Sequence, residues 1–229
     1  MKKITMIFFT MCVTFFNLAA QSNGPSLDNY FSPISTDVTV PDNEGFIRRW
    51  LLLEPIDKPN RTNIVFTDSY LREAFNTEYF KGQFTTFPKN GQKVKVGKQK
   101  LTWHALDSKL FNVKLFRFAS GLDKQIYGVL FWAATIIECE EEIPNVRLAV
   151  GSNSASMWWL NGEEGVLLSG DRRMVKDDCT SKRLTLKKGK NILRGAIING
   201  PGMSDFCIRF IDEKGLPVNN ISITIQPQK

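Results

Sequence analysis

Histidine is almost absent from this chain, and its scarcity limits the hydrolytic chemistry that the sequence can support. The 229 residues contain one histidine, His104, in the segment LTWHALD. A Ser-His-Asp hydrolase also needs a nucleophile elbow, usually Gly-x-Ser-x-Gly at a strand-to-helix turn. The nearest segment is GSNSA at 151–155, which lacks the second glycine and is not followed by a helical pattern. We therefore expect no catalytic residue, and we interpret His104 as a surface or hydrogen-bonded structural residue.

Cysteine is scarce as well. Of the four cysteines, Cys12 falls in the N-terminal apolar run, and Cys139, Cys179 and Cys207 follow it. Three cysteines allow at most one disulfide and leave a thiol over. No Cys-x-x-Cys pair is present, so the sequence does not support a zinc site. It favours small buried cysteines in strands, and their pairing stays open.

Acidic residues cluster in few places, and none of the clusters predicts a metal site. The segment 171–178 interleaves three aspartates with three basic residues, namely Asp171, Asp177, Asp178, Arg172, Arg173 and Lys176. The aspartates could supply oxygen ligands to Ca²⁺, but the basic residues oppose a dication. We interpret the segment as a charged, solvated loop, and we expect no metal and no cofactor. Paired carboxylates for glycoside hydrolysis, here or at Glu140–Glu142, stay an alternative because sequence does not give their spacing across a fold.

The longest uncharged stretch stands at the N-terminus. Lys2 and Lys3 precede the apolar run Ile4–Leu18, and two alanines follow it. This is the pattern of a secretory signal peptide over residues 1–20. The run is shorter than the roughly 20 residues of a membrane span. We expect cleavage near Gln21 and a secreted protein without a membrane partner, in the periplasm or at the exterior of a Gram-negative bacterium.

The excess of basic over acidic residues is small. Removing the two lysines of the leader from 30 basic residues leaves 28 against 23 acidic residues, a net charge of +5. Basic and acidic residues are interleaved, as in IIECEEEIPNVR. A mixed surface of this kind gives little support for nucleic-acid binding, so we expect no nucleic-acid partner.

The C-terminal half of the sequence consists mainly of strand-like runs. From residue 111 onward they are FNVKLFRFA, YGVLFWAATIIE, VRLAVG, MWWL, GVLL, KRLTL, NILRGAII, DFCIRFID and ISITI. Turn segments rich in Gly, Asn, Asp and Pro separate them, which predicts an all-β fold, an antiparallel β-sandwich of the jelly-roll type. YGVLFWAATIIE is apolar throughout, and this predicts a central strand with both faces covered.

The N-terminal part predicts a linker and a single helix. Residues 21–45 are rich in Ser, Asn, Asp and Pro and predict a flexible linker, whereas 46–226 predict one domain. Within that domain the segment DSYLREAFNTEYF, 68–80, has apolar residues at helical spacing. We expect one short helix in an N-terminal insertion, with Asp68 as its N-cap.

Five motifs follow one another between Val146 and Phe210. They are a Val-Gly-Ser turn, a WLNG hairpin, RLTLKKGKNIL, NGPG and FCIRF. Their order resembles galactose-binding-domain-like jelly rolls, accessory modules of secreted polysaccharide-degrading enzymes. With FIRRWLLLEPI and KLTWHALD before them, the chain resembles the N-terminal module of Bacteroidetes acetylxylan esterases, without the α/β-hydrolase domain of those enzymes. The resemblance implies a carbohydrate-associated module and an esterase or glycosidase as partner.

The segment MWWLNGEEGV, 157–166, carries the sharpest local prediction. Asn161-Gly162 favours a tight hairpin turn. Successive side chains of a strand face opposite sides, so Trp158 and Trp159 cannot share a face. We expect one ring in the core and the other exposed or covered by a loop.

A sugar site needs an exposed ring with polar groups beside it. The candidates are Trp158, Trp159, Asn153, Arg172, Arg173 and Asp177, and each also has a structural interpretation as core ring, turn residue or solvated charge. The first hypothesis is a non-catalytic module that binds a plant-type, xylan-like polysaccharide or oligosaccharide. The second is a structural interaction domain for a partner hydrolase, which an exposed apolar patch at FIRRWLLL would mark. An enzyme is the third.

Overall fold

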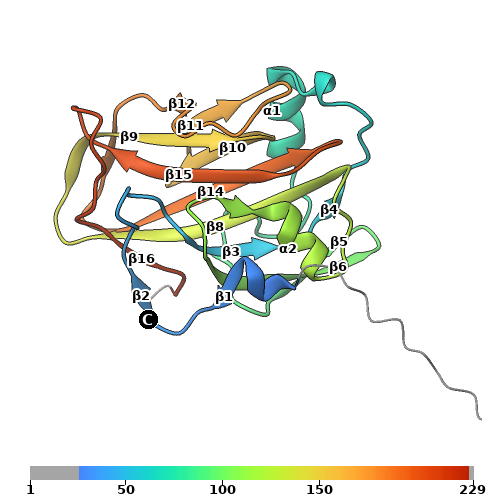
Figure 1. Cartoon of the computed structure of the whole chain (residues 1–229), viewed down its shortest axis with the longest axis horizontal. Helices are drawn as coiled ribbons and strands as arrows, with labels where there is room; N and C mark the ends of the chain where they lie inside the picture. The colour runs from blue at the N-terminus through green and yellow to red at the C-terminus, as the bar shows by residue number, and fades with distance from the viewer. Residues whose placement is uncertain (1–25, 227–229) are drawn as a thin grey trace, which may run out of the picture.

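The computed structural model describes residues 26–226, which form two antiparallel sheets packed face to face (Figure 1). The signal peptide expected over 1–20 lies outside the described residues. The predicted all-β antiparallel sandwich is confirmed.

The larger sheet runs through the middle of the molecule. Its strands, in spatial order, are β1 (Phe31–Pro33), β6 (Gln99–Ser108), β3 (Arg49–Leu53), β8 (Val129–Cys139), β14 (Gly189–Asn199), β10 (Ala155–Leu160) and β11 (Glu163–Leu168). Short strands extend it: β5 (Lys93–Val96) pairs with β6, β4 (Ile56–Asp57) and β16 (Ser222–Thr224) pair with β8, and β2 (Val38–Thr39) pairs with β16. The smaller sheet has the order β12 (Cys179–Thr180), β9 (Ile143–Ser152), β15 (Asp205–Ile211) and β7 (Val113–Lys114), with β13 (Leu184–Leu186) also on β9.

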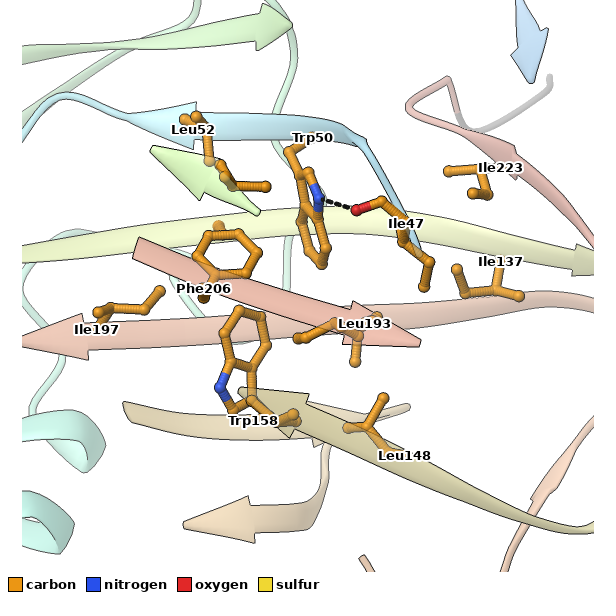
Figure 2. Close-up of a cluster of buried hydrophobic side chains, with 14 of the residues drawn as sticks. Ile47, Trp50, Leu52, Ile137, Leu148, Trp158, Leu193, Ile197, Phe206 and Ile223 are labelled. Atoms are coloured by element: carbon orange, nitrogen blue, oxygen red, sulfur yellow. Dashed lines mark hydrogen bonds between the residues drawn. The ribbon is translucent and has the colours of Figure 1, made fainter. Parts of the chain in front are cut away.

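The space between the sheets holds an aromatic core. Trp50, Trp158 and Phe206 meet there, with ring centroids 5.8 Å apart for the two tryptophans and 4.9 Å apart for Trp158 and Phe206 (Figure 2). The indole Nε1 of Trp50 donates a hydrogen bond of 2.9 Å to the carbonyl of Ile47, so the buried polar atom is satisfied. These contacts join β3, β10 and β15, and thereby both sheets.

The outer face of the larger sheet is also buried, because the chain from residue 58 to 92 lies over it. In this segment, helix α1 (Asp68–Asn76) turns Leu71 and Phe75 into a second apolar cluster that includes Trp132 of β8. All residues of β8 except Glu138 are buried, as predicted for a central strand covered on both faces. The molecule therefore has three layers, a cover, the larger sheet and the smaller sheet.

The helices differ from the prediction in number and in bounds. Helix α1 ends at Asn76 instead of residue 80, and Thr67 is the N-cap, since its Oγ1 accepts a hydrogen bond from the Tyr70 amide. A second helix, α2 (Leu115–Gly121), replaces part of the strand expected in FNVKLFRFA. Leu115, Phe118 and Ala119 stand at helical spacing and all reach the core, which the alternating pattern concealed. No helix within residues 26–226 is long and apolar enough to cross a membrane.

The segment expected as a flexible linker, 21–45, is partly built into the sandwich. After the short 3₁₀ turn η1 (Leu27–Asn29), strand β1 pairs with β6 and β2 pairs with β16. Buried Arg49 binds both carboxylate oxygens of Asp107 and the carbonyl of Thr36, each at 2.8 Å. Strands of two and three residues give no periodic pattern, so composition alone suggested a linker here.

Candidate functional site

The two tryptophans of the β10–β11 hairpin separate as predicted. Asn161 and Gly162 have φ of 54° and 87° and close the turn. Trp158 is fully buried between the sheets and cannot contact a ligand. Trp159 lies on the opposite face, 9% exposed, where its ring stacks on Trp132 at 5.7 Å between centroids. The ring under the cover is therefore Trp159.

The other sequence candidates lie away from Trp159. Asn153 accepts a 2.6 Å hydrogen bond from the Asp205 amide at the β9–β10 turn. The remaining three belong to the loop between β11 and β12, in which Arg172 pairs with Asp178, Asp177 pairs with Arg209 of β15, and Arg173 is exposed. A Cβ at Gly151 of β9 would stand 2.0 Å from the Val175 carbonyl, so this loop packs on the smaller sheet. The six candidates do not form one site.

A cavity of about 460 Å³ lies between the cover and the outer face of the larger sheet, the face on which Trp159 lies. Its apolar wall comprises Phe80, Pro88, Trp103, Trp132, Ala133 and Ala134. Its polar lining comprises Glu78, Lys81, Gln83, Thr85, Thr86, Gln92 and Arg194. The small Ala134 stands beside Arg194 in the β8–β14 register, which leaves room over the sheet at this point.

The cover forms a fixed wall because it is pinned by its own side chains. Gln83 accepts from the Tyr79 amide at 2.9 Å and donates to the Thr77 carbonyl at 2.9 Å. Glu78 accepts from the Gly82 amide at 3.0 Å. The Tyr79 hydroxyl donates to the Ala74 carbonyl, and burial raises the pKa of this phenol. The loop is thus preformed around the cavity.

A smaller cavity of about 210 Å³ adjoins the first one at Arg194 and is also lined by Asn76, Phe84, Trp159 and Gly162. Phe84 is 37% exposed, and its ring meets Trp132 edge to face at 5.7 Å between centroids. It is an aromatic ring at the cavity mouth that remains accessible to a ligand.

Arg194 is a charged side chain that is buried in this site. It is 8% exposed, and burial lowers the pKa of its guanidinium. Its Nη2 donates to the Thr86 carbonyl at 3.2 Å, and its Nε has no hydrogen-bond partner within residues 26–226. In the same part of the chain no carboxylate forms a salt bridge with it. The indole Nε1 atoms of Trp103 and Trp132 are likewise buried without a partner.

His104 lies outside this cavity. Its Nε2 is 3.1 Å from Glu54 Oε1, and Lys124 Nζ is 3.2 Å from Glu54 Oε2. Burial raises the pKa of Glu54, but the hydrogen bonds from His104 and Lys124 and the Lys124 charge outweigh it, so the pKa is lowered. His104 is hydrogen-bonded, as predicted, and its structural role stays a prediction.

A separate, more open cleft of about 350 Å³ lies near β4. It is lined by Asp57, Pro59, Asn60, Arg61, Gln125, Tyr127 and Gly128. Tyr127 is the one aromatic residue in this lining, whereas several aromatic residues line the two cavities at Arg194.

Sequence reasoning found Trp159 but missed Phe84, Trp103, Trp132 and Arg194. One signal was available, since Arg194 is the single charge inside the apolar run ILRGAII. A charge in a strand whose neighbours are buried on both faces needs a partner or a polar cavity.

Comparison with known proteins gives weak similarities. No protein-family model matches the chain, and no curated protein matches it. Among solved structures, a PA14 sugar-binding domain from an RTX adhesin is 11% identical over 76% of this chain and 96% of its own, with a TM-score of 0.41. The PA14 domain of the MpAFP antifreeze protein is 9% identical over 84% and 95%, also with a TM-score of 0.41.

A β-glucosidase from Kluyveromyces marxianus in complex with glucose is 18% identical over 57% of this chain, with a TM-score of 0.37. The match spans 16% of that enzyme. At these TM-scores the similarities decide neither a family nor a ligand for this chain. None of them shows a relation to acetylxylan esterases, and that resemblance stays a prediction.

Proposed function

We propose that this protein is a non-catalytic carbohydrate-binding module and that its ligand lies in the cavity beneath the cover of the larger sheet. The observation that carries the proposal is the combination of aromatic wall and polar lining in a preformed hollow of about 460 Å³. Small-molecule sites have volumes of about 300–1,000 Å³ and few, fixed polar groups.

A saccharide fits this combination because it has apolar CH faces and a rim of hydroxyls. Phe84, in the lining of the smaller cavity that adjoins this one at Arg194, offers a partly exposed ring for the CH face, next to Trp132. Gln83, Thr85 and Thr86 belong to the polar lining on the cover. Their oxygen and nitrogen atoms suit hydrogen bonds to sugar hydroxyls.

Binding fits the cavity better than glycoside hydrolysis does. Glycosidases use two carboxyl groups that flank the scissile bond. Among the described residues that line the cavity, Glu78 is the one carboxylic acid, and it already accepts the Gly82 amide. We therefore assign the cavity to recognition of a saccharide.

Interaction with a partner hydrolase lacks the feature expected for it. An exposed apolar patch at FIRRWLLL would have favoured this hypothesis, but strand β3 within the run is buried throughout. Xylan as ligand, an esterase or glycosidase partner, and export to the periplasm or cell exterior stay predictions.

The test is affinity electrophoresis of the mature chain, residues 21–229, in gels that contain arabinoxylan, galactan, glucuronoxylan or polygalacturonate. We expect retardation by at least one of these polymers. Phe84→Ala should weaken binding by about 1 kcal/mol, roughly fivefold in Kd, because it removes an aromatic contact and little buried area. Ala134→Leu should weaken it further by filling the cavity.

Tyr127→Ala is the matched control, since it removes a comparably exposed ring from the separate cleft near β4. It should leave retardation unchanged. Loss of binding in Tyr127→Ala with none in Phe84→Ala would refute the cavity as the site. Absence of retardation by every polymer would refute the function.

A further inference from the structure

Buried hydrogen-bond donors without partners gather around the proposed cavity. Arg194 Nε, Trp103 Nε1 and Trp132 Nε1 are all buried and unpaired within residues 26–226, and all three residues line this one hollow. Each of these atoms is a donor that cannot accept a hydrogen bond. Buried polar groups are nearly always hydrogen-bonded. The wall is therefore suited to a ligand rich in acceptors.

The charge of Arg194 adds to this preference. The other buried arginine within residues 26–226 is Arg49, and it is neutralised by two hydrogen bonds to Asp107. Among the described residues, Arg194 has instead a single neutral partner, the Thr86 carbonyl. A buried charge without a counter-charge is costly, and an anion in the cavity would offset that cost.

The surroundings of Arg194 shape the space where an anion would lie. Trp159 of β10 stands directly across from it in the register, and Trp132 stacks on Trp159. Of the two other charged residues in the lining, Lys81 would favour an anion, whereas Glu78 would oppose it. Glu78 comes from the cover and already accepts the Gly82 amide, so the sheet side of the cavity carries the positive charge.

We propose, as an extension that rests on the function proposed above, that the cavity selects saccharides with an anionic group, a carboxylate or a sulfate ester, and that Arg194 binds this group. Guanidinium forms two parallel hydrogen bonds with such oxyanions. The aromatic rings beside it contact the sugar ring that carries the anion. Selectivity for acidic over neutral sugar then comes from one buried residue.

The experiment uses pairs of ligands that share a sugar backbone, of which one member carries anionic groups and the other is neutral. Polygalacturonate is compared with its methyl ester, and dextran sulfate with dextran, by affinity electrophoresis of the mature chain at low and high NaCl. We expect the charged member of at least one pair to bind about 10- to 100-fold more tightly, and we expect salt to weaken this binding. Retardation by polygalacturonate alone identifies a carboxylate ligand, and retardation by dextran sulfate alone identifies a sulfate ester.

Two variants assign the effect to Arg194. Arg194→Met should remove the preference for the charged member, so that the two members of each pair bind equally. Arg194→Lys keeps the charge but not the planar fork, so it should retain part of the preference and also serves if the methionine variant does not fold. Arg173→Met removes the same charge from the exposed loop and should behave as wild type.

Three results would contradict, in turn, the anion proposal, the role of Arg194 and the proposed function. Equal binding of both members of each pair, unaffected by Arg194→Met, would overturn the anion proposal and leave sugar binding intact. An equal loss in Arg173→Met and Arg194→Met would attribute the preference to overall charge and overturn the role of Arg194. If neither these polymers nor the neutral arabinoxylan and galactan bind, the proposed function falls as well.

Discussion

Gly195 of β14 leaves the space that Trp158 occupies, and replacing it with alanine tests how the core is packed. The two residues are direct partners in the β10–β14 register. A Cβ at position 195 would stand 2.1 Å from Trp158 Cζ3 and 2.5 Å from Cη2. The indole cannot withdraw easily, because Trp50 and Phe206 pack against it.

The cost follows from two opposing effects. Overpacking of a tight core destabilises by about 1–3 kcal/mol and occasionally by more. Alanine gains about 0.5–1 kcal/mol over glycine in a strand through lower backbone entropy in the unfolded chain. The new Cβ would lie well below van der Waals distance from a rigid indole ring, so the cost of overpacking should exceed the entropic gain. We therefore expect Gly195→Ala to lower the free energy of unfolding by about 2–3 kcal/mol.

Urea unfolding followed by tryptophan fluorescence measures this loss. Gly165→Ala on β11 is the matched control, since its Cβ would approach no atom closer than 3.5 Å. We expect that variant to stay within about 0.5 kcal/mol of wild type. If Gly195→Ala were as stable as Gly165→Ala, the packing of Trp158 on Gly195 would be wrong.

Two further predictions concern titratable groups. Glu54→Gln should cost about 1.5 kcal/mol at neutral pH, since it weakens charge-assisted hydrogen bonds from His104 and Lys124. Because the pKa of Glu54 is lowered in the folded protein, the stability that its carboxylate contributes is complete above the ordinary value of 4.5 and is lost as the pH falls through the lowered value. The unfolding free energies of wild type and Glu54→Gln, measured in urea, should therefore converge in acid. A difference that stays constant with pH would contradict this. Burial raises the pKa of Cys207 to about 12, so iodoacetamide at neutral pH should modify the partly exposed Cys179 first in the folded protein, as mass spectrometry of peptides would show. Rapid labelling of Cys207 before unfolding would contradict its burial.

Local rules predicted the features that depend on neighbours in sequence. The turn at Asn161-Gly162 and the separation of Trp158 from Trp159 follow from φ preferences and strand alternation, and both are present. Helix α2 was missed because KLFRFA satisfies an alternating and a helical pattern at once. Packing of Leu115 and Phe118 into the core decides between them, and this contact is not local.

The residues of the candidate site could not be predicted from local sequence patterns, for a different reason. Trp103, Trp132 and Arg194 come from β6, β8 and β14, which strand pairing brings into one sheet, and Phe84 comes from the cover. Trp103 stands in KLTWHALD, but the resemblance gave its ring no role. The other three stand in no motif, and Trp132 and Arg194 are in runs that are typical of core strands. Only the cover of residues 58–92 turns that outer face into the wall of a cavity, and its irregular sequence gives no sign of where it lies.

The register between β10 and β14 couples the fold to the site. Trp158 faces Gly195 toward the core, and the next pair along, Trp159 and Arg194, faces the cavity. If β14 slipped by one residue, its side chains would change faces, which would place Arg194 between the sheets and remove Gly195 from beneath the ring of Trp158. Both consequences are expensive, one through an unpaired buried charge and the other through a steric clash. The same pairing that packs the core therefore fixes the arginine on the outer face of the sheet, where the cover of residues 58–92 completes the cavity around it.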